Sequence, residues 1–142
     1  MIRYANAYDL YSISQLLDKL FESENYKTVT HDLNFVLSSL AAVLPNPDVD
    51  LIVSENNGVV DGAACAAAQD TFLCPDVNYY EQFVVSDNPM NVRYMLKFLK
   101  KRKVERGCKR FIVGVSTSEN PRYESLLKRM GFTSFGKTLK LE

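Results

Sequence analysis

The most chemically suggestive part of the sequence is a strongly basic segment in its second half. Between Arg93 and Arg110 the chain carries nine Lys or Arg residues, opposed only by Glu105. Residues 1–90 contain 3 basic and 13 acidic side chains, whereas residues 91–142 contain 14 and 4. A basic half beside an acidic half suits a polyanion on one side and a cationic molecule on the other. The same pattern fits a solvated helix face, or self-association through the oppositely charged surfaces, so the partner stays open here.

Nucleophilic and metal-binding side chains are sparse. The cysteines, Cys65, Cys74 and Cys108, are odd in number, form no CxxC pair and are accompanied by a single histidine, His31. A structural zinc site needs four such ligands, a disulfide scaffold needs paired cysteines, and a cysteine nucleophile needs a base nearby. We therefore expect thiols that are buried or half-buried in a reducing compartment, a solvated histidine and no metal site.

Length and composition predict one cytoplasmic domain spanning residues 1–142. The chain is 46% hydrophobic and 24% charged, which is ordinary for a globular protein. It contains no Pro/Gly/Ser-rich linker, low-complexity tract or repeat. The longest apolar run, 59–68, is interrupted by Asp61 and is too short to cross a bilayer, and the amino terminus has no hydrophobic signal core. We expect no contact with a membrane.

Hydrophobic periodicity predicts the elements that would position the basic segment. Asn6 with Asp9 forms a variant of the capping box, Thr30 would cap a second helix, and Asn57-Gly58 is a strong hairpin signal. Asn88 followed by Pro89 would start the basic helix. The predicted strands cover 2–4, 51–53, 59–68, 79–85, 111–115 and 133–141, with helices beginning near residues 7, 30, 88 and 120. The predicted order is β-α-α-β-β-β-α-β-α-β, an α/β chain.

This order resembles the GNAT superfamily of N-acetyltransferases over essentially the whole chain. The most specific pieces are Ile2-Arg3 with Asp9, the segment 105–110, and Asn120 with the segment 126–132. The last is close to the superfamily's habitual Asn…Leu-Tyr-x-Lys-Leu-Gly-Phe ending. The resemblance implies a mixed central sheet with helices on both faces. It also implies that strands 79–85 and 111–115 splay apart around the thioester arm of acetyl-CoA.

The resemblance further implies which residues hold the cofactor. Backbone groups of Val84 and Val85 would bind the pantetheine arm as a neighbouring strand would, although both valines could simply fill the core. Asn120 would hold the arm from the other side. The family's pyrophosphate motif, Arg/Gln-x-x-Gly-x-Gly/Ala, corresponds to the segment 86–93, which is shorter and contains no glycine. Asn91 and Arg93 are the predicted cofactor contacts in this segment.

Three side chains in that segment oppose phosphate binding through the backbone. Asn88 would occupy free amide groups, Pro89 has no amide hydrogen, and Asp87 would repel a phosphate. Direct contact with Arg93 and Lys97 would offset part of this repulsion.

Two catalytic roles follow from the same resemblance. Family enzymes often deprotonate the amine through a carboxylate on the fourth strand, where this chain has Glu81, with Phe83 beside it to raise its pKa. Many also use a tyrosine five residues before the final Phe as general acid. Leu127 stands at that position, so Tyr123, one helical turn earlier, is the candidate. A solvent-exposed Glu81 and a Tyr123 that only packs on the sheet are the plain alternatives.

The expected function is an acetyl-CoA- or acyl-CoA-dependent N-acyltransferase that acts on a primary amine of a cationic small molecule or peptide. The alternative is a catalytically degenerate GNAT-fold binding or structural protein, like small members of the fold in tailed bacteriophages, some of them virion-associated. Nucleic-acid binding is a weaker possibility. Tyr94 and Phe98 lie one turn apart on the basic helix and could stack on bases, but no recognised nucleic-acid motif is present.

Overall fold

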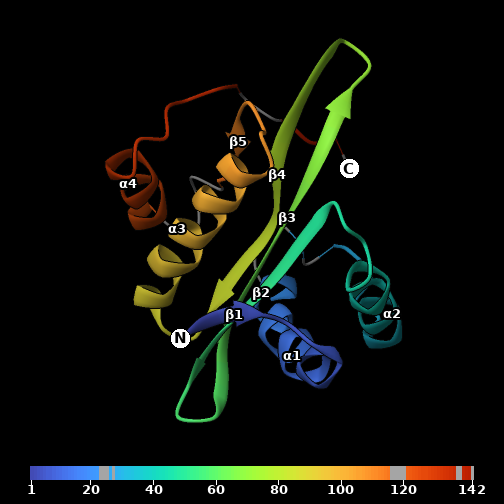
Figure 1. Cartoon of the computed structure of the whole chain (residues 1–142). Coiled ribbons are helices and arrows are strands. Elements are labelled where there is room, and N and C mark those ends of the chain that lie inside the picture. Colours follow the sequence, from blue (N-terminus) through green and yellow to red (C-terminus); the bar gives the residue numbers. More distant parts are fainter. Residues whose placement is uncertain (23–25, 27, 116–120, 137–138, 142) are drawn as a thin grey trace.

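The computed structural model of the protein describes residues 1–22, 26, 28–115, 121–136 and 139–141 (Figure 1). They form a five-stranded sheet in the order β1-β2-β3-β4-β5, in which only the β4–β5 pair is parallel. The predicted mixed sheet is therefore confirmed. The elements are β1 (Ile2–Tyr4), a 3-10 turn η1 (Ala7–Asp9), α1 (Leu10–Phe21), α2 (Leu33–Val43), β2 (Val49–Asn56), β3 (Val59–Thr71), β4 (Cys74–Ser86), α3 (Pro89–Glu105), β5 (Phe111–Ile112) and α4 (Pro121–Arg129).

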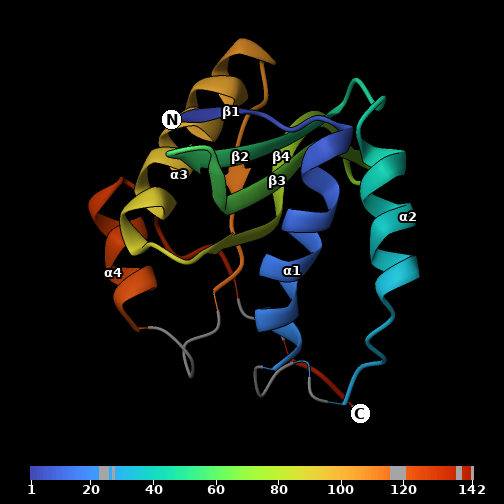
Figure 2. The same cartoon turned by 90° about the horizontal axis from the view of Figure 1, so that it is seen from below.

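Helices cover both faces of this sheet (Figures 1 and 2). On one face, α1 and α2 bury Ile13, Leu16 and Leu40 against β2, β3 and β4. On the other face, α3 buries Met95 and Leu99. Helix α4 lies beside α3, and the Lys100 ammonium donates to the Met130 carbonyl just past the end of α4 at 2.8 Å. A cation at that position also complements the negative end of the helix dipole.

Local sequence signals account for several of the element boundaries. The Asn6 side chain accepts from the Tyr8 amide at 2.9 Å and Asp9 accepts from the Asn6 amide at 2.8 Å, which confirms the predicted capping box. Asn57 and Gly58 have φ of 53° and 78°, the left-handed values that a tight hairpin turn requires. The predicted cap of the second helix was wrong, because the Asp32 carboxylate accepts the Phe35 amide at 3.1 Å and takes the place assigned to Thr30.

The carboxyl-terminal part of the fold differs from the prediction. The described residues of the segment 133–141 form no strand, and β5 ends at Ile112 instead of residue 115. Instead of pairing in a sheet, Phe135 lies with its ring under the Arg110 guanidinium, 5.3 Å from the ring centroid. The strand β5 is short because β4 pairs with it only at Tyr79 and Tyr80, and none of the described residues after Ile112 continues this parallel pairing.

The central strand β3 is built almost entirely from small residues. Ala63, Ala64, Ala66 and Ala67 are buried, and the helical layers approach β3 closely from both sides. A Cβ added at Gly62 would lie 3.1 Å from Ser86 Oγ, 3.2 Å from Met95 Cε and 3.3 Å from Ser54 Cβ. The small residues of this strand therefore allow close packing around it.

A buried carboxylate connects four elements at one end of the sheet. Asp50, at the start of β2, is 2% exposed. Its oxygens accept hydrogen bonds from Tyr79 Oη (2.5 Å), Arg106 Nε (2.7 Å) and Nη2 (3.1 Å), Arg102 Nε (3.3 Å) and Tyr4 Oη (3.3 Å). These donors come from β4, from the carboxyl-terminal end of α3 and from β1. We call this set of side chains the Asp50 cluster.

We expect Asp50→Asn to destabilise the fold strongly. The substitution removes the buried negative charge that two half-buried guanidinium groups face, and removing one partner of a buried ion pair typically costs about 3–5 kcal/mol. Urea denaturation followed by circular dichroism measures the change. The matched control is Asp48→Asn, two residues away on an exposed position, which should change the unfolding free energy by less than about 0.5 kcal/mol. Equal stability of the two variants would contradict the role given to the cluster.

The same cluster predicts how stability depends on pH. Burial alone would raise the pKa of Asp50, but the hydrogen bonds from Arg106 and Tyr79 outweigh it, so the pKa lies below its ordinary value. The folded state then binds fewer protons than the unfolded state, and stability rises with pH in the acid range. The contribution is complete above the ordinary carboxyl pKa of about 3.9 and is lost as the pH falls through the lower folded pKa. The urea midpoint, measured across that pH range, should rise less steeply with pH in Asp50→Asn than in the wild type.

Candidate functional site

The strands β4 and β5 run together only briefly. They pair at Tyr79 with Phe111 and at Tyr80 with Ile112, preceded by two backbone hydrogen bonds of 2.8 Å, from Tyr79 N to Arg110 O and from Lys109 N to Val77 O. Past Tyr80, β4 continues to pair with β3, but none of the described residues pairs with its opposite edge. This free edge of β4, beyond Tyr80, is where the sequence placed the opening for a thioester arm.

A β-bulge lies at the point where the two strands part. Ala66 of β3 pairs with Glu81, whereas the preceding Cys65 pairs with Phe83, so Gln82 is an extra residue in β4. A bulge bends its strand and shifts the alternation of side chains by one position. As a result Phe83 and Val85 pack in the cluster under α1, while Tyr79 belongs to the cluster under α3. The expectation that Phe83 lies beside Glu81 and raises its pKa was therefore wrong.

The bulge also decides which backbone groups of β4 are available. The Asp87 amide donates to the Asp61 carbonyl of β3 at 2.8 Å. Since backbone groups alternate along a strand, those of Val85 also face β3, and those of Val84 face the free edge. The Val85 side chain is buried in the core. Of the two predicted valines, Val84 has backbone groups directed to the opening and Val85 does not.

Glu81 lies where β4 and β5 stop pairing. Its Oε2 accepts the amide hydrogen of Gly114, beyond β5, at 3.1 Å, so the carboxylate bridges the two diverging segments. Burial raises the pKa of Glu81, and the hydrogen bond from Gly114 offsets this only in part. A carboxylate with a raised pKa is better matched to accepting a proton near neutral pH than an exposed one.

Tyr123 of α4 lies within electrostatic range of Glu81. Burial raises the pKa of this phenol, and the negative charge of Glu81 raises it further. Tyr123 therefore keeps its proton at neutral pH, as a general acid must. The fold thus brings together the two predicted catalytic side chains from β4 and α4, although their roles remain predictions.

The turn between β4 and α3, residues 86–91, is closed by its own hydrogen bonds. Each backbone amide from residue 87 to residue 91 has an acceptor inside the protein, except at Pro89, which has no amide hydrogen. The bonds are Asp87 N to Asp61 O (2.8 Å), Asn88 N to Ser86 Oγ (3.0 Å), Met90 N to Asn88 Oδ1 (3.0 Å) and Asn91 N to Asn88 O (3.0 Å). The occupation of the amides by Asn88, expected from the sequence, is what the structure shows.

The remaining predicted cofactor contacts differ in their availability. Asn91 is 6% exposed and its Nδ2 donates to Asp61 Oδ1 at 2.9 Å and to Ser86 Oγ at 3.1 Å, so this side chain ties α3 to the sheet. Arg93 is exposed, and no carboxylate of the described residues forms an ion pair with it. Asn120 lies outside the described residues.

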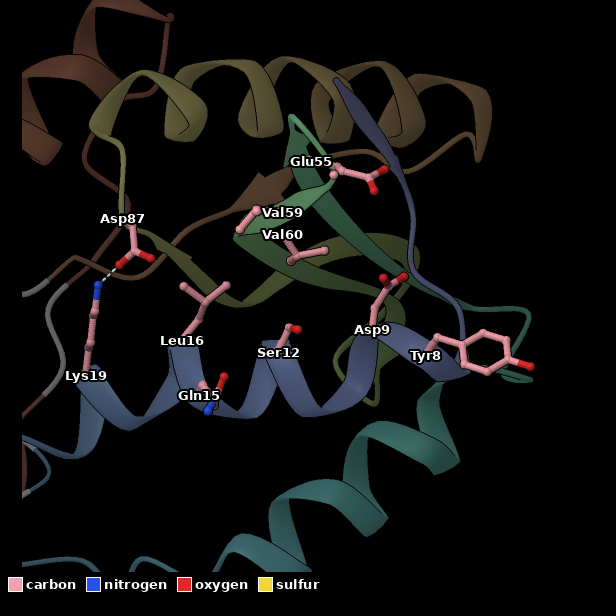
Figure 3. Close-up of a pocket in the computed structure, with 11 residues that line it drawn as sticks. Tyr8, Asp9, Ser12, Gln15, Leu16, Lys19, Glu55, Val59, Val60 and Asp87 are labelled. Atoms are coloured by element: carbon pink, nitrogen blue, oxygen red, sulfur yellow. Dashed lines mark ion pairs between the residues drawn. The ribbon is translucent and has the colours of Figure 1, made fainter.

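A polar groove of about 500 Å³ lies on the other side of the β4 end, between α1 and the β2–β3 hairpin (Figure 3). Ser12 and Gln15 on α1 face Glu55 and Val60 of the hairpin. At one end, Lys19 forms an ion pair with Asp87. The two other carboxylates of the groove, Asp9 and Glu55, both pair with Arg3, at 2.8 and 2.9 Å. Its charged groups are thus largely paired within the protein.

A second hollow, of about 460 Å³, lies on α4. It is lined by Arg122 and Arg129, together with Pro121 and Ser125. Unlike the groove beside α1, this hollow is lined by two basic residues and no acidic residue. Neither hollow includes Glu81 or Val84.

Other candidate groups have structural roles. Burial raises the pKa of the Cys65 thiol to about 12 and also raises that of Cys108, so neither is a thiolate. His31 stacks on Phe21, with ring centroids 4.2 Å apart, and contacts Asp18 at 2.9 Å. Phe98 packs edge-on against the ring of Tyr4 instead of facing solvent.

The described part of the chain has neither a metal-binding cluster nor a membrane-spanning helix. No group of three or more His, Cys, Asp or Glu residues there is arranged to hold a metal ion. None of the helices in that part is long and apolar enough to span a membrane.

Sequence reasoning missed three features of the site. It gave no sign of the bulge at Gln82, of Gly114 as the partner of Glu81, or of the ion pair between Lys19 and Asp87. A bulge and a contact across separate segments leave no local pattern in one sequence. The hydroxyl of Ser86, two residues before Asn88, was a readable signal, because serine commonly closes such turns.

Comparison with known proteins shows the fold. No family model and no curated protein sequence matches this chain. Solved structures match it over 100% of its length. One is a transcriptional regulator from Bacillus halodurans, with a TM-score of 0.81 and 15% identity over 98% of that chain. Two others are a predicted acetyltransferase with acetyl-CoA from Clostridium acetobutylicum (TM-score 0.77, 17% identity, 95% of that chain) and an acetyltransferase of Trypanosoma brucei (TM-score 0.72, 21% identity, 98% of that chain). At these identities the likeness concerns the fold alone. The chain has the fold of the GNAT acetyltransferases.

Proposed function

We propose that this protein transfers an acyl group from a thioester donor, such as acetyl-CoA, to a primary amine. The observation that carries this proposal is the position of Glu81, whose carboxylate lies where β4 and β5 part, has a raised pKa, and is close enough to Tyr123 to influence it. A proton acceptor and a proton donor beside a free strand edge are the groups that this transfer requires.

The reaction assigns one step to each group. The neutral amine attacks the thioester carbonyl, a C–N bond forms, and Glu81 takes the proton that the nitrogen loses. The C–S bond breaks, and Tyr123 gives its proton to the departing thiolate. The amide hydrogen of Val84 donates to the donor's arm and positions it. Solvent returns the proton from Glu81 to Tyr123, so amide and thiol leave an unchanged enzyme.

The acceptor we favour carries a positive charge. Ten more acidic than basic residues lie in the first 90 positions, counting 13 against 3. In the fold these positions supply β1 to β4 and both helices of one face. A surface of that sign draws cations towards it. A cationic small molecule or peptide with a free amino group fits this description.

The second candidate is a binding or structural protein that has kept the fold and lost the chemistry. The observation in its favour is the closed turn 86–91, which offers no free amide to a diphosphate. One similar structure is named a transcriptional regulator, so the fold is not limited to proteins named as enzymes. None of the three similar structures named above is a bacteriophage protein, and that part of the expectation has no support.

Binding of acetyl-CoA separates these two candidates. We expect millimolar acetyl-CoA to raise the melting temperature, because a ligand at one hundred times its dissociation constant stabilises the folded state by about 2.7 kcal/mol. Differential scanning fluorimetry measures the shift, with ATP at the same concentration as a control for unspecific anion binding. A melting temperature that acetyl-CoA leaves unchanged would remove the transferase proposal and favour the binding protein.

Glu81→Gln tests the role of the base once an acceptor amine has been found. We expect turnover to fall by about 10²- to 10⁴-fold, the usual contribution of general base catalysis, with acetyl-CoA affinity almost unchanged. The rate of the unmodified enzyme should rise with pH through the raised pKa of Glu81, since only the ionised carboxylate accepts a proton, and Glu81→Gln should lose this rise. Glu105→Gln, at the far end of α3, is the control and should behave as wild type. Parallel loss of turnover and affinity in Glu81→Gln would mean that Glu81 has another role.

A further inference from the structure

We propose that the acyl donor is recognised through its pantetheine arm and one phosphate, and that the nucleotide diphosphate of a coenzyme adds no affinity at the turn between β4 and α3. The donor class is thus a phosphopantetheine thioester, in which the phosphopantetheine belongs either to CoA or to a carrier protein. This inference rests on the proposed acyl transfer. It concerns how the donor is held, which the transfer chemistry itself does not determine.

The first argument is that the turn has no free amide to offer. A diphosphate at a helix start is normally held by amide hydrogens that point outward without partners. Here the amides of residues 87, 88, 90 and 91 all donate to protein oxygens at 2.8–3.0 Å, and Pro89 has none. A diphosphate would have to displace the Asn88 side chain that caps α3, and the loss of such a cap costs about 1 kcal/mol.

The second argument is the charge around the turn. The Asp61 carboxylate accepts from Asn56 at 2.8 Å and from Asn91 at 2.9 Å, and it is ionised, because these hydrogen bonds hold its pKa below the ordinary value despite burial. Asp87 stands in the turn itself and is balanced by Lys19. Among the described residues no cation pairs with Asp61, so its negative charge remains next to the position that a doubly charged diphosphate would take, and like charges repel.

The third argument is the presence of unpaired cations just beyond the turn. Arg93 and Lys97 lie one helical turn apart on α3 and are both exposed. Within the described ranges neither forms an ion pair, whereas Lys101 and Arg102 further along α3 pair with Glu105. Two side chains at this spacing suit one phosphate group, held by charge-assisted hydrogen bonds from the side chains and not by the backbone.

Affinities for three acetyl thioesters test the inference: acetyl-CoA, acetyl-4′-phosphopantetheine and acetyl-pantetheine, each measured by isothermal titration calorimetry on the full chain. We expect the first two dissociation constants to agree within about threefold, and the third to be roughly tenfold weaker or more, because it lacks the phosphate. Acetyl-CoA that binds thirtyfold or more tightly than acetyl-4′-phosphopantetheine would overturn the inference and leave the acyl transfer standing. If none of the three binds, the proposed function itself fails.

Variants make the test independent of any single ligand. Arg93→Gln with Lys97→Gln should bring the affinity for acetyl-4′-phosphopantetheine down to that for acetyl-pantetheine, while Lys101→Gln should leave it unchanged. Asp87→Gly with Asn88→Gly removes one carboxylate and frees the Met90 amide, so it should bind acetyl-CoA several-fold more tightly relative to acetyl-4′-phosphopantetheine. An unchanged affinity in the first variant, or an unchanged ratio in the second, would contradict the inference. The source of the donor is identified by comparing turnover with acetyl-CoA and with an acetylated carrier protein.

Discussion

The arrangement of the sheet depends on one buried charge. Asp50 has almost no contact with water, and it is held by two tyrosines and two arginines from β1, β4 and α3. Such a group is tolerable inside a protein only when all its acceptor positions are satisfied, so these elements have to meet at this point. The cluster fixes the middle of β4 at Tyr79, one of the two residues that pair with β5. With that point fixed, the rest of β4 beyond Tyr80 can leave β5 without loosening the fold.

The bulge at Gln82 determines which groups of β4 lie at the point where β4 and β5 part. Without the extra residue, Glu81 and Phe83 would share a face, and the backbone of Val85 would face the opening. With it, Glu81 contacts Gly114 at the point where β4 and β5 part, and Val84 has its backbone groups directed to the free edge. A single additional residue therefore sets both the position of the proposed base and the strand edge available to the donor.

Much of the fold could be predicted because its signals are local. The capping box at Asn6, the hairpin at Asn57-Gly58 and the start of α3 at Asn88-Pro89 all depend on residues adjacent in the chain. The errors concern interactions between distant parts. The segment 133–141 alternates like a strand, but its described residues join no strand of the sheet. The cap of α2 is Asp32 and not Thr30, because only the folded backbone decides which oxygen reaches the amide.

The site was predictable only in part, for the same reason. The resemblance to a known family indicated Glu81 and Tyr123, and the fold brings them close, but Gly114 became visible as a partner only in three dimensions. The missing glycines in the segment 86–93 were the most informative sequence feature of the site. In the structure, the backbone amides of this glycine-free turn already donate hydrogen bonds to protein oxygens.

The alanine-rich centre of β3 limits how this protein can vary. Methyl groups on both faces of the middle strand let the two helical layers sit close together, so the molecule is thin across its centre. Because interiors are packed as densely as crystals, a larger residue on β3 would push away the helical layer that its side chain faces. Added volume can therefore be accommodated only by exchange with a helix residue such as Ile13 or Met95, so substitutions in this core should occur in compensating pairs.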